Sequence, residues 1–172
     1  MWSREKHRIA DCLLSSGNIF YMKRTLVILL LACLQKTGFT QQTIPQKARL
    51  NHIALYVTDL KTSTAFYQHI VGLDTIPEPF HDGRHTWFSI GPKSHLHLIQ
   101  GAISKTEHEK NTHLCFSVPS VEAFIPVLKK NKITYENWAG EKSAVTNRVD
   151  GVKQIYFRDP DGYWLEINDA KE

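Results

Sequence analysis

The sequence predicts an α+β fold in which two paired βαβββ modules form a cupped mixed sheet. Three observations support this: residues 50–101 and 111–169 repeat one pattern, each repeat holds one amphipathic helix, and short alternating strands fill the rest. A doubly wound fold would alternate every strand with a helix, so the small number of helices argues against that class.

The repeat is clearest where each module begins. His52 aligns with His113 at an offset of 61 residues, which places Ile53 over Leu114 and keeps the apolar alternation in phase. Alternation with a period of two is typical of strands that bury one face. Self-similarity at a fixed offset predicts that both modules have the same topology.

One helix follows the opening strand of each module. The first is expected from about Asp59 to Val71, and Gly72 supplies a stop signal. The second is expected from about Ser120 to Lys130, with Ser120 as a candidate N-cap.

Short strands and turns are expected after each helix. The expected strands are residues 74–80, 85–91 and 95–101 in the first module and residues 133–139, 153–159 and 163–169 in the second. In the second module a polar loop is expected at residues 141–147, and the DPDG turn begins at Asp159.

Residues 1–40 are predicted to be a leader that contains a signal peptide. Met22 is the expected true start, because Lys23 and Arg24 precede a charge-free run over residues 25–34. Ten helical residues span ~15 Å, about half the hydrocarbon thickness, so no stable membrane span is expected. A lipoprotein signal ending at Cys33 is the weaker alternative. If the leader functions, the protein is exported to the periplasm or outside the cell; otherwise it is cytoplasmic.

Residues 41–49 are predicted to be a linker, and the body that follows carries no charge excess. The whole chain has 21 Lys+Arg against 17 Asp+Glu, but the first 40 residues hold six basic and two acidic residues. The remainder has 15 of each sign, so no nucleic-acid partner is expected. Three cysteines exclude a disulfide scaffold.

Four polar residues interrupt apolar strands at positions that match by the repeat. His52 and His113 lie on the first strand of each module, and His97 and Glu166 lie on the last. A single histidine on such a strand is usually structural, but four matched positions indicate one site. Three imidazoles and one carboxylate suit a divalent Zn, Ni, Co, Fe or Mn ion, so the sheet is expected to surround a metal site.

The same alternation predicts the walls of a pocket for a small organic molecule. The candidate substrate-binding residues on the ligand face are Trp87, Cys115, Gln154, Tyr156 and Trp164. Cys115 is interpreted as a small filler of this wall rather than a nucleophile. Four further histidines are expected near loops or on the opposite strand face, as solvated side chains: His81, His85, His95 and His108.

These motifs resemble the vicinal oxygen chelate superfamily, which includes glyoxalase I, bleomycin-resistance proteins and extradiol dioxygenases. The matching segments are residues 50–55, 59–60, 112–114 and 159–166, and the resemblance covers about residues 50–169. It implies paired βαβββ modules around a divalent metal, with His52, His113 and Glu166 at ligand positions. His97 falls where glyoxalase I has a glutamate and methylmalonyl-CoA epimerase has a glutamine.

The resemblance implies a metal-dependent lyase or isomerase of the glyoxalase type, similar to lactoylglutathione lyase. Such an enzyme acts on a small oxygen-chelating substrate through an enediolate. Glu166, the one carboxylate among the ligands, is the expected catalytic base. The family also implies a homodimer that completes its sites across a two-fold interface.

Three other functions fit the same motifs. An extradiol dioxygenase would use a His/His/carboxylate iron site, and a thiol transferase would act on fosfomycin. A drug-binding protein without enzymatic activity is the third, and the four ligand-type residues count against it.

Overall fold

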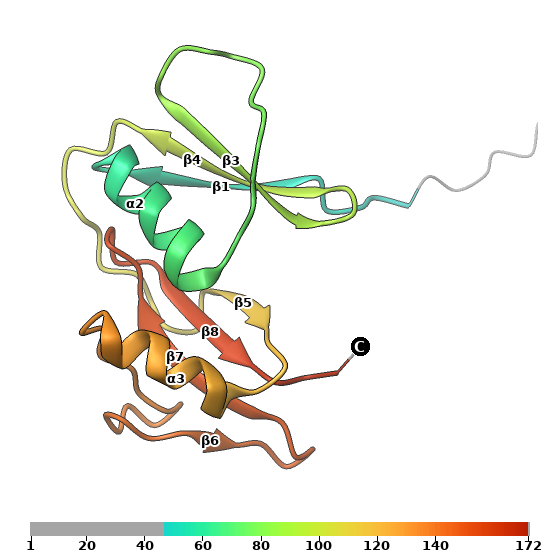
Figure 1. Cartoon of the computed structure of the whole chain (residues 1–172), viewed down its shortest axis with the longest axis vertical. Coiled ribbons are helices and arrows are strands. Elements are labelled where there is room, and N and C mark those ends of the chain that lie inside the picture. The colour runs from blue at the N-terminus through green and yellow to red at the C-terminus, as the bar shows by residue number, and fades with distance from the viewer. Residues whose placement is uncertain (1–46, 172) are drawn as a thin grey trace, which may run out of the picture. The chain divides into compact units, whose positions relative to one another are not determined.

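The computed structural model describes residues 47–171 (Figure 1). The elements of module 1 are β1 (His52–Val57), α2 (Leu60–Phe66), η1 (Tyr67–Val71), β2 (Thr75–Ile76), β3 (His85–Gly91) and β4 (Ser94–Gln100). Those of module 2 are β5 (His113–Ser117), α3 (Val121–Lys130), β6 (Thr146–Asn147), β7 (Lys153–Arg158) and β8 (Trp164–Asn168).

Both modules have one topology. Their sheets have the orders β1-β4-β3-β2 and β5-β8-β7-β6. β1 pairs with β4 and β5 with β8 in parallel, whereas the other pairs are antiparallel. Figure 1 shows α2 beside the first sheet and α3 beside the second. The predicted α+β fold of two βαβββ modules with mixed sheets is confirmed.

The strand register also follows the repeat. Ala54 pairs with His97 on the neighbouring strand, and Cys115 pairs with Glu166. Ala54 and Cys115 are themselves equivalent at the offset of 61 residues. His97 and Glu166 therefore occupy the same position of the two modules, as the sequence predicted.

The helices begin and end where their capping residues predict. The Asp59 side chain accepts a hydrogen bond from the Thr62 backbone N–H at 2.6 Å, and Ser120 accepts one from Ala123 at 3.2 Å. After α2 the chain continues as the wider π-helical turn η1, which the sequence did not predict. This turn ends at Gly72, whose φ of 85° lies in the left-handed region that glycine tolerates.

The strand prediction was wrong around residues 133–147. Residues 133–139 form no strand, and only Glu136 makes isolated bridges, to Lys142 and Tyr156. The Asn137 N–H and carbonyl bond instead to Glu141 and Gly140, which closes a turn. The short strand β6 lies inside the segment predicted as a loop. Of the strand expected at residues 74–80, only Thr75–Ile76 forms.

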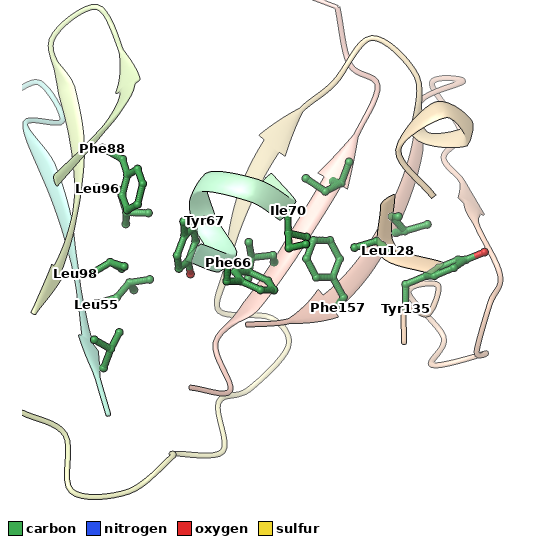
Figure 2. Close-up of a cluster of buried hydrophobic side chains, with 14 of the residues drawn as sticks. Leu55, Phe66, Tyr67, Ile70, Phe88, Leu96, Leu98, Leu128, Tyr135 and Phe157 are labelled. Atoms are coloured by element: carbon green, nitrogen blue, oxygen red, sulfur yellow. The ribbon is translucent and has the colours of Figure 1, made fainter. Parts of the chain in front are cut away.

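The core lies on the helix-bearing faces of both sheets. Figure 2 shows Phe66 of α2 beside Phe157 of β7, and their ring centroids are 6.2 Å apart. Phe88, Leu96 and Leu98 are fully buried on the first sheet. Each such side chain contributes roughly 1.5–3 kcal/mol on burial. The apolar face of each sheet thus packs against the helices. His52, His97, His113 and Glu166 lie on the opposite faces.

The DPDG turn joins module 2 to module 1 through buried carboxylates. Asp161 accepts hydrogen bonds from the Thr58 N–H and hydroxyl, each at 2.7 Å, and from the Ser63 hydroxyl at 2.6 Å. Asp159 accepts one from the Tyr67 hydroxyl at 2.9 Å. Burial raises the pKa of Asp159, although its hydrogen bonds oppose that shift. The junction therefore uses the end of β1 and the buried side of α2 and η1.

The predicted leader at residues 1–40 lies outside the described residues, as does the linker up to residue 46. Within residues 47–171, no helix has both the length and the apolar character needed to cross a bilayer.

Candidate metal centre

In module 1, stacked aromatic rings surround a buried imidazole. The rings of His52 and His97 stack with centroids 4.5 Å apart, and Trp87 stacks with His97 at 3.7 Å. His97 is only 8% exposed, and its Nε2 has no hydrogen-bond partner. Burial lowers the pKa of His97, and the nearby imidazoles of His52 and His95 add to this shift. The ring is therefore held neutral, the form in which imidazole binds metals.

The indole of Trp87 is the second unsatisfied group of module 1. Its Nε1 is buried without an acceptor, and among the side chains of residues 47–171 only His97 Nε2 shares that condition. An unpaired buried polar atom costs about 1–3 kcal/mol. Module 1 thus presents two nitrogen atoms whose partners would have to come from outside it.

In module 2, His113 and Glu166 are in direct contact. His113 Nε2 lies 3.2 Å from Glu166 Oε2, and His113 Nδ1 lies 2.8 Å from the Lys110 carbonyl oxygen. A carbonyl only accepts, so Nδ1 carries the proton and Nε2 of a neutral ring presents its lone pair to the carboxylate. Two acceptors at this distance need a cation between them, either a proton on Nε2 or a metal ion. Metal-binding histidines commonly donate their other N–H to a backbone carbonyl in this way.

Glu166 is held by hydrogen bonds to both carboxylate oxygens. Tyr156 donates to Oε2 at 2.5 Å, while Asn168 and Cys115 donate to Oε1 at 2.9 and 3.4 Å. Burial raises the pKa of Glu166, but these bonds and the nearby His113 outweigh it, so the pKa is lowered. The side chain is therefore an oriented carboxylate.

Further polar residues extend this network, and sequence reasoning missed one of them, Asn168. Gln154 donates to the Tyr156 hydroxyl at 2.7 Å, and Ser117 donates to Asn168 at 2.9 Å. Asn168 had a usable signal, because it lies two residues after Glu166 and shares its face. Burial raises the pKa of Tyr156 well above its usual range, so the phenol stays a donor.

The predicted pocket residues fall into two groups. Cys115, Gln154, Tyr156 and Trp164 lie on the Glu166 face of module 2, whereas Trp87 lies beside His97 in module 1. Desolvation, followed by the Glu166 charge, raises the pKa of the Cys115 thiol to about 12, which argues against a nucleophile. The residue is exposed, however, so it does not fill a buried wall. A pocket of about 500 Å³ borders Gln154 and Tyr156.

Across residues 47–171, no three His, Cys, Asp or Glu side chains converge as metal ligands. The structure brings His52 close to His97 and His113 close to Glu166, each pair within its own module. The site of four ligands stays a prediction.

The four histidines expected to be solvated behave differently from one another. His81 is exposed as predicted, with 81% of its side chain accessible. His95 was misplaced: it shares the face of His97, two residues away, with ring centroids 6.2 Å apart. His85 is mostly buried against Asp82, and His108 stacks on Tyr163 at 4.0 Å. The contact of His85 with Asp82 and the stack of His108 on Tyr163 shield these two rings from water, an effect that strand alternation alone does not report.

Known proteins support this architecture. The chain is 31% identical to human mitochondrial methylmalonyl-CoA epimerase over 96 residues, which is 49% of this chain and 54% of the epimerase. The chain thus spans about half the length of that relative. It is 26% identical to lactoylglutathione lyase of Pseudomonas putida, over 76% of this chain and 91% of the lyase.

A solved structure with the same fold is the fosfomycin resistance protein FosX from Listeria monocytogenes. Its TM-score is 0.58 at 23% identity, over 73% of this chain and 96% of FosX. The sequence profile of the Glyoxalase/Bleomycin resistance protein/Dioxygenase superfamily matches residues 49–167. This match covers more than half of the chain and both modules, and the chain therefore belongs to that superfamily.

Proposed function

We propose that this protein is a metal-dependent lyase or isomerase of the glyoxalase type that acts on a small oxygen-chelating substrate. The observation that carries the proposal is the pair of matched polar positions, His52 with His97 and His113 with Glu166, at the same register of two sheets. The distant relatives include a lyase and an epimerase, which supports enzymatic activity.

The residues present fit a divalent ion. His97 offers a buried neutral nitrogen without a partner, and His113 directs Nε2 at a carboxylate oxygen. With His52 they form a set of three imidazoles and one carboxylate, which suits Zn, Ni, Co, Fe or Mn. When bound there, the ion would act as a Lewis acid toward two neighbouring substrate oxygens.

The protein's own residues would then handle the proton and the substrate. Glu166 is the proposed base, but its hydrogen bonds lower its pKa, so it has to lose one of these donors before it takes a proton. Tyr156, which stays protonated, is positioned to supply that donor or withdraw it. The aromatic rings of Trp87 and Trp164 would exclude water from the substrate.

We propose further that the active form is a homodimer. The modules of one chain are joined through α2 and the DPDG turn, on the faces opposite the ligand pairs. His52 and Tyr56 on the first sheet, and Trp138 near Tyr156, remain exposed. A second copy could place its module against such a face and supply the two missing ligands.

Metal analysis of protein purified without chelator, followed by an activity screen, tests the proposal. We expect about one divalent ion per site and, for His113→Ala, at least a tenfold weaker affinity in a folded protein. Unchanged metal stoichiometry in that variant would contradict the ligand set, and a monomer by light scattering would contradict the dimer. The screen should include 2-oxoaldehyde hemithioacetals, catechols and fosfomycin, because ring cleavage of catechols or thiol addition to fosfomycin would reassign the reaction. Wild-type protein that binds no metal would favour a drug-binding role.

A further inference from the structure

Lys110 has an unusual set of contacts for a lysine in the segment that connects the modules. Its ammonium forms an ion pair with Glu136 and donates to the carbonyls of Asn137 and Trp138, at 3.4 and 3.3 Å. The side chains of Lys110 and Glu136 are only 18% and 21% exposed. An ion pair this sheltered is screened less by salt than a surface pair.

The same ammonium lies over two rings of the ligand face. It is 5.7 Å from the ring centroid of Tyr156 and 5.1 Å from that of Trp164. Both distances are within the range of a cation–π contact. Tyr156 donates a hydrogen bond to Glu166, so the Lys110 ammonium lies over the ring of a residue that orients this carboxylate.

The backbone of Lys110 contacts His113, the partner of Glu166. Its carbonyl oxygen accepts the hydrogen bond from His113 Nδ1, and the carbonyl of His108 accepts one from Trp164 Nε1 at 2.9 Å. Residues 101–112 form no helix or strand. Backbone hydrogen bonds hold the ends of this segment, from Gly101 and Ala102 to Val57 and from Thr112 to Glu109, and the side chain of Lys110 adds a further attachment. The carbonyl that orients the His113 ring thus belongs to a residue whose ammonium is itself anchored.

We propose that Lys110 is a positioning residue that holds the His113 ring with Nδ1–H on the Lys110 carbonyl and Nε2 directed at Glu166. Its ammonium anchors the chain to Glu136 and the neighbouring carbonyls, and the anchored carbonyl then orients the imidazole. The inference rests on the proposed metal function only in its consequence for affinity, because the hydrogen bond of His113 Nδ1–H can be observed without metal.

The test compares Lys110→Met with Lys110→Arg and with Lys130→Met. Methionine keeps an unbranched stem over the rings but removes the charge, and arginine restores a cation. Lys130 is exposed at the end of α3 and serves as the matched control. The measurements are the ¹H shift and solvent exchange of His113 Nδ1–H in metal-free protein, which report its hydrogen bond to the Lys110 carbonyl, and the zinc affinity from competition with a chromophoric chelator.

We expect Lys110→Met to show faster exchange of His113 Nδ1–H and zinc affinity about 10–100-fold weaker, with partial recovery in Lys110→Arg and no change in Lys130→Met. A folded Lys110→Met protein with wild-type Nδ1–H exchange and zinc affinity would overturn the proposal. If that variant does not fold, Glu136→Gln removes the same ion pair and must reproduce the faster exchange. Wild-type protein in which Nδ1–H is protected but which binds no zinc would refute the metal function and leave the positioning role standing.

Discussion

Modules 1 and 2 share topology and register but differ in the chemistry of their ligand faces. In module 1 the imidazole of His97 is enclosed by rings, and both it and Trp87 have a buried nitrogen without a partner. In module 2 the carboxylate of Glu166 receives hydrogen bonds on both oxygens. The repeat therefore places His97 and Glu166 at equivalent positions, while their surroundings decide whether the polar atoms of each side chain have hydrogen-bond partners.

Under the proposed metal function, this difference gives modules 1 and 2 different roles. A carboxylate with hydrogen bonds on both oxygens keeps one orientation and a lowered pKa, so Glu166 stays an anion until it loses one of its donors. An unsatisfied neutral imidazole gains more from binding an ion, because the cost of its isolation disappears. Under the proposed metal function, module 2 would supply an oriented carboxylate, and module 1 would gain more free energy when the ion binds.

The largest expected effect comes from removing the charge of Glu166, the carboxylate of module 2. In metal-loaded Glu166→Gln protein, we expect kcat to fall at least about a hundredfold, because an amide cannot accept the substrate proton. This corresponds to about 3 kcal/mol or more on the barrier. Steady-state kinetics on the substrate found by the screen, with metal content measured in the same sample, provides the test. A near-normal kcat would exclude Glu166 as the base and direct attention to His97.

The second prediction concerns the junction that both modules share. Asp161→Ala leaves the Thr58 and Ser63 donors unpaired in a buried place, so we expect the free energy of unfolding to fall by about 3 kcal/mol. Urea denaturation monitored by tryptophan fluorescence measures this loss. The exposed Asp82, which bonds only to nearby residues of its own loop, is a matched control, and Asp82→Ala should change stability by less than about 1 kcal/mol. Equal losses in the two variants would mean that the DPDG turn does not stabilise the junction.

Sequence patterns predicted the backbone of this fold well because period-two alternation and capping residues act locally. Asp59, Ser120 and Gly72 mark helix ends through bonds to residues within one turn or through backbone conformation. The repeat also located His97 and Glu166 correctly, since register is set by burial of the alternate face.

The environment of the ligands could not be predicted in the same way. The bond from His113 to the Lys110 carbonyl involves no pattern of residue types, and the stack of His108 on Tyr163 joins residues 55 positions apart. The missing strand at residues 133–139 has both a local and a distant cause. Asn137 closes a turn with Gly140 and Glu141, and Lys110, far away in sequence, donates to the carbonyls of Asn137 and Trp138. Together these contacts override local strand propensity.

The third prediction is a pH dependence at the junction. Burial raises the pKa of Asp159 in the folded protein above its ordinary value of 3.8. At pH values between the ordinary pKa and the folded pKa, the folded state therefore binds more protons than the unfolded state. Its contribution to stability is therefore complete below the ordinary pKa and is lost as the pH rises through the folded pKa. One such group changes the free energy of unfolding by at most about 1.4 kcal/mol per pH unit.

Urea denaturation of wild type and Asp159→Asn between about pH 3.5 and pH 7 isolates this effect. Asparagine keeps one acceptor oxygen for the Asp161 and Tyr163 N–H groups, its amide can donate to the Tyr67 hydroxyl, and it does not titrate. The stability of wild type relative to the variant should decline as the pH rises, and a relative stability that rises with pH would show that the hydrogen bonds to Asp159 outweigh its burial.

The smallest expected effect is the difference between removing the indole N–H of Trp87 in module 1 and removing the hydroxyl of Tyr156 in module 2. Tyr156→Phe removes a donor to Glu166 and leaves Gln154 without its acceptor, so we expect a loss of about 1–3 kcal/mol in unfolding free energy. Trp87→Phe removes a donor that has no acceptor, and relief of that cost offsets part of the lost ring contact with His97. Its net effect should therefore be at least about 1 kcal/mol smaller than that of Tyr156→Phe. Both are aromatic replacements on a ligand face, so each controls for the other, and metal-free protein must be used so that bound ions do not mask the difference. If Trp87→Phe is the more destabilising change, the indole N–H has a hydrogen-bond partner in solution. The contrast between unpaired polar atoms in module 1 and hydrogen-bonded ones in module 2 would then be wrong for Trp87.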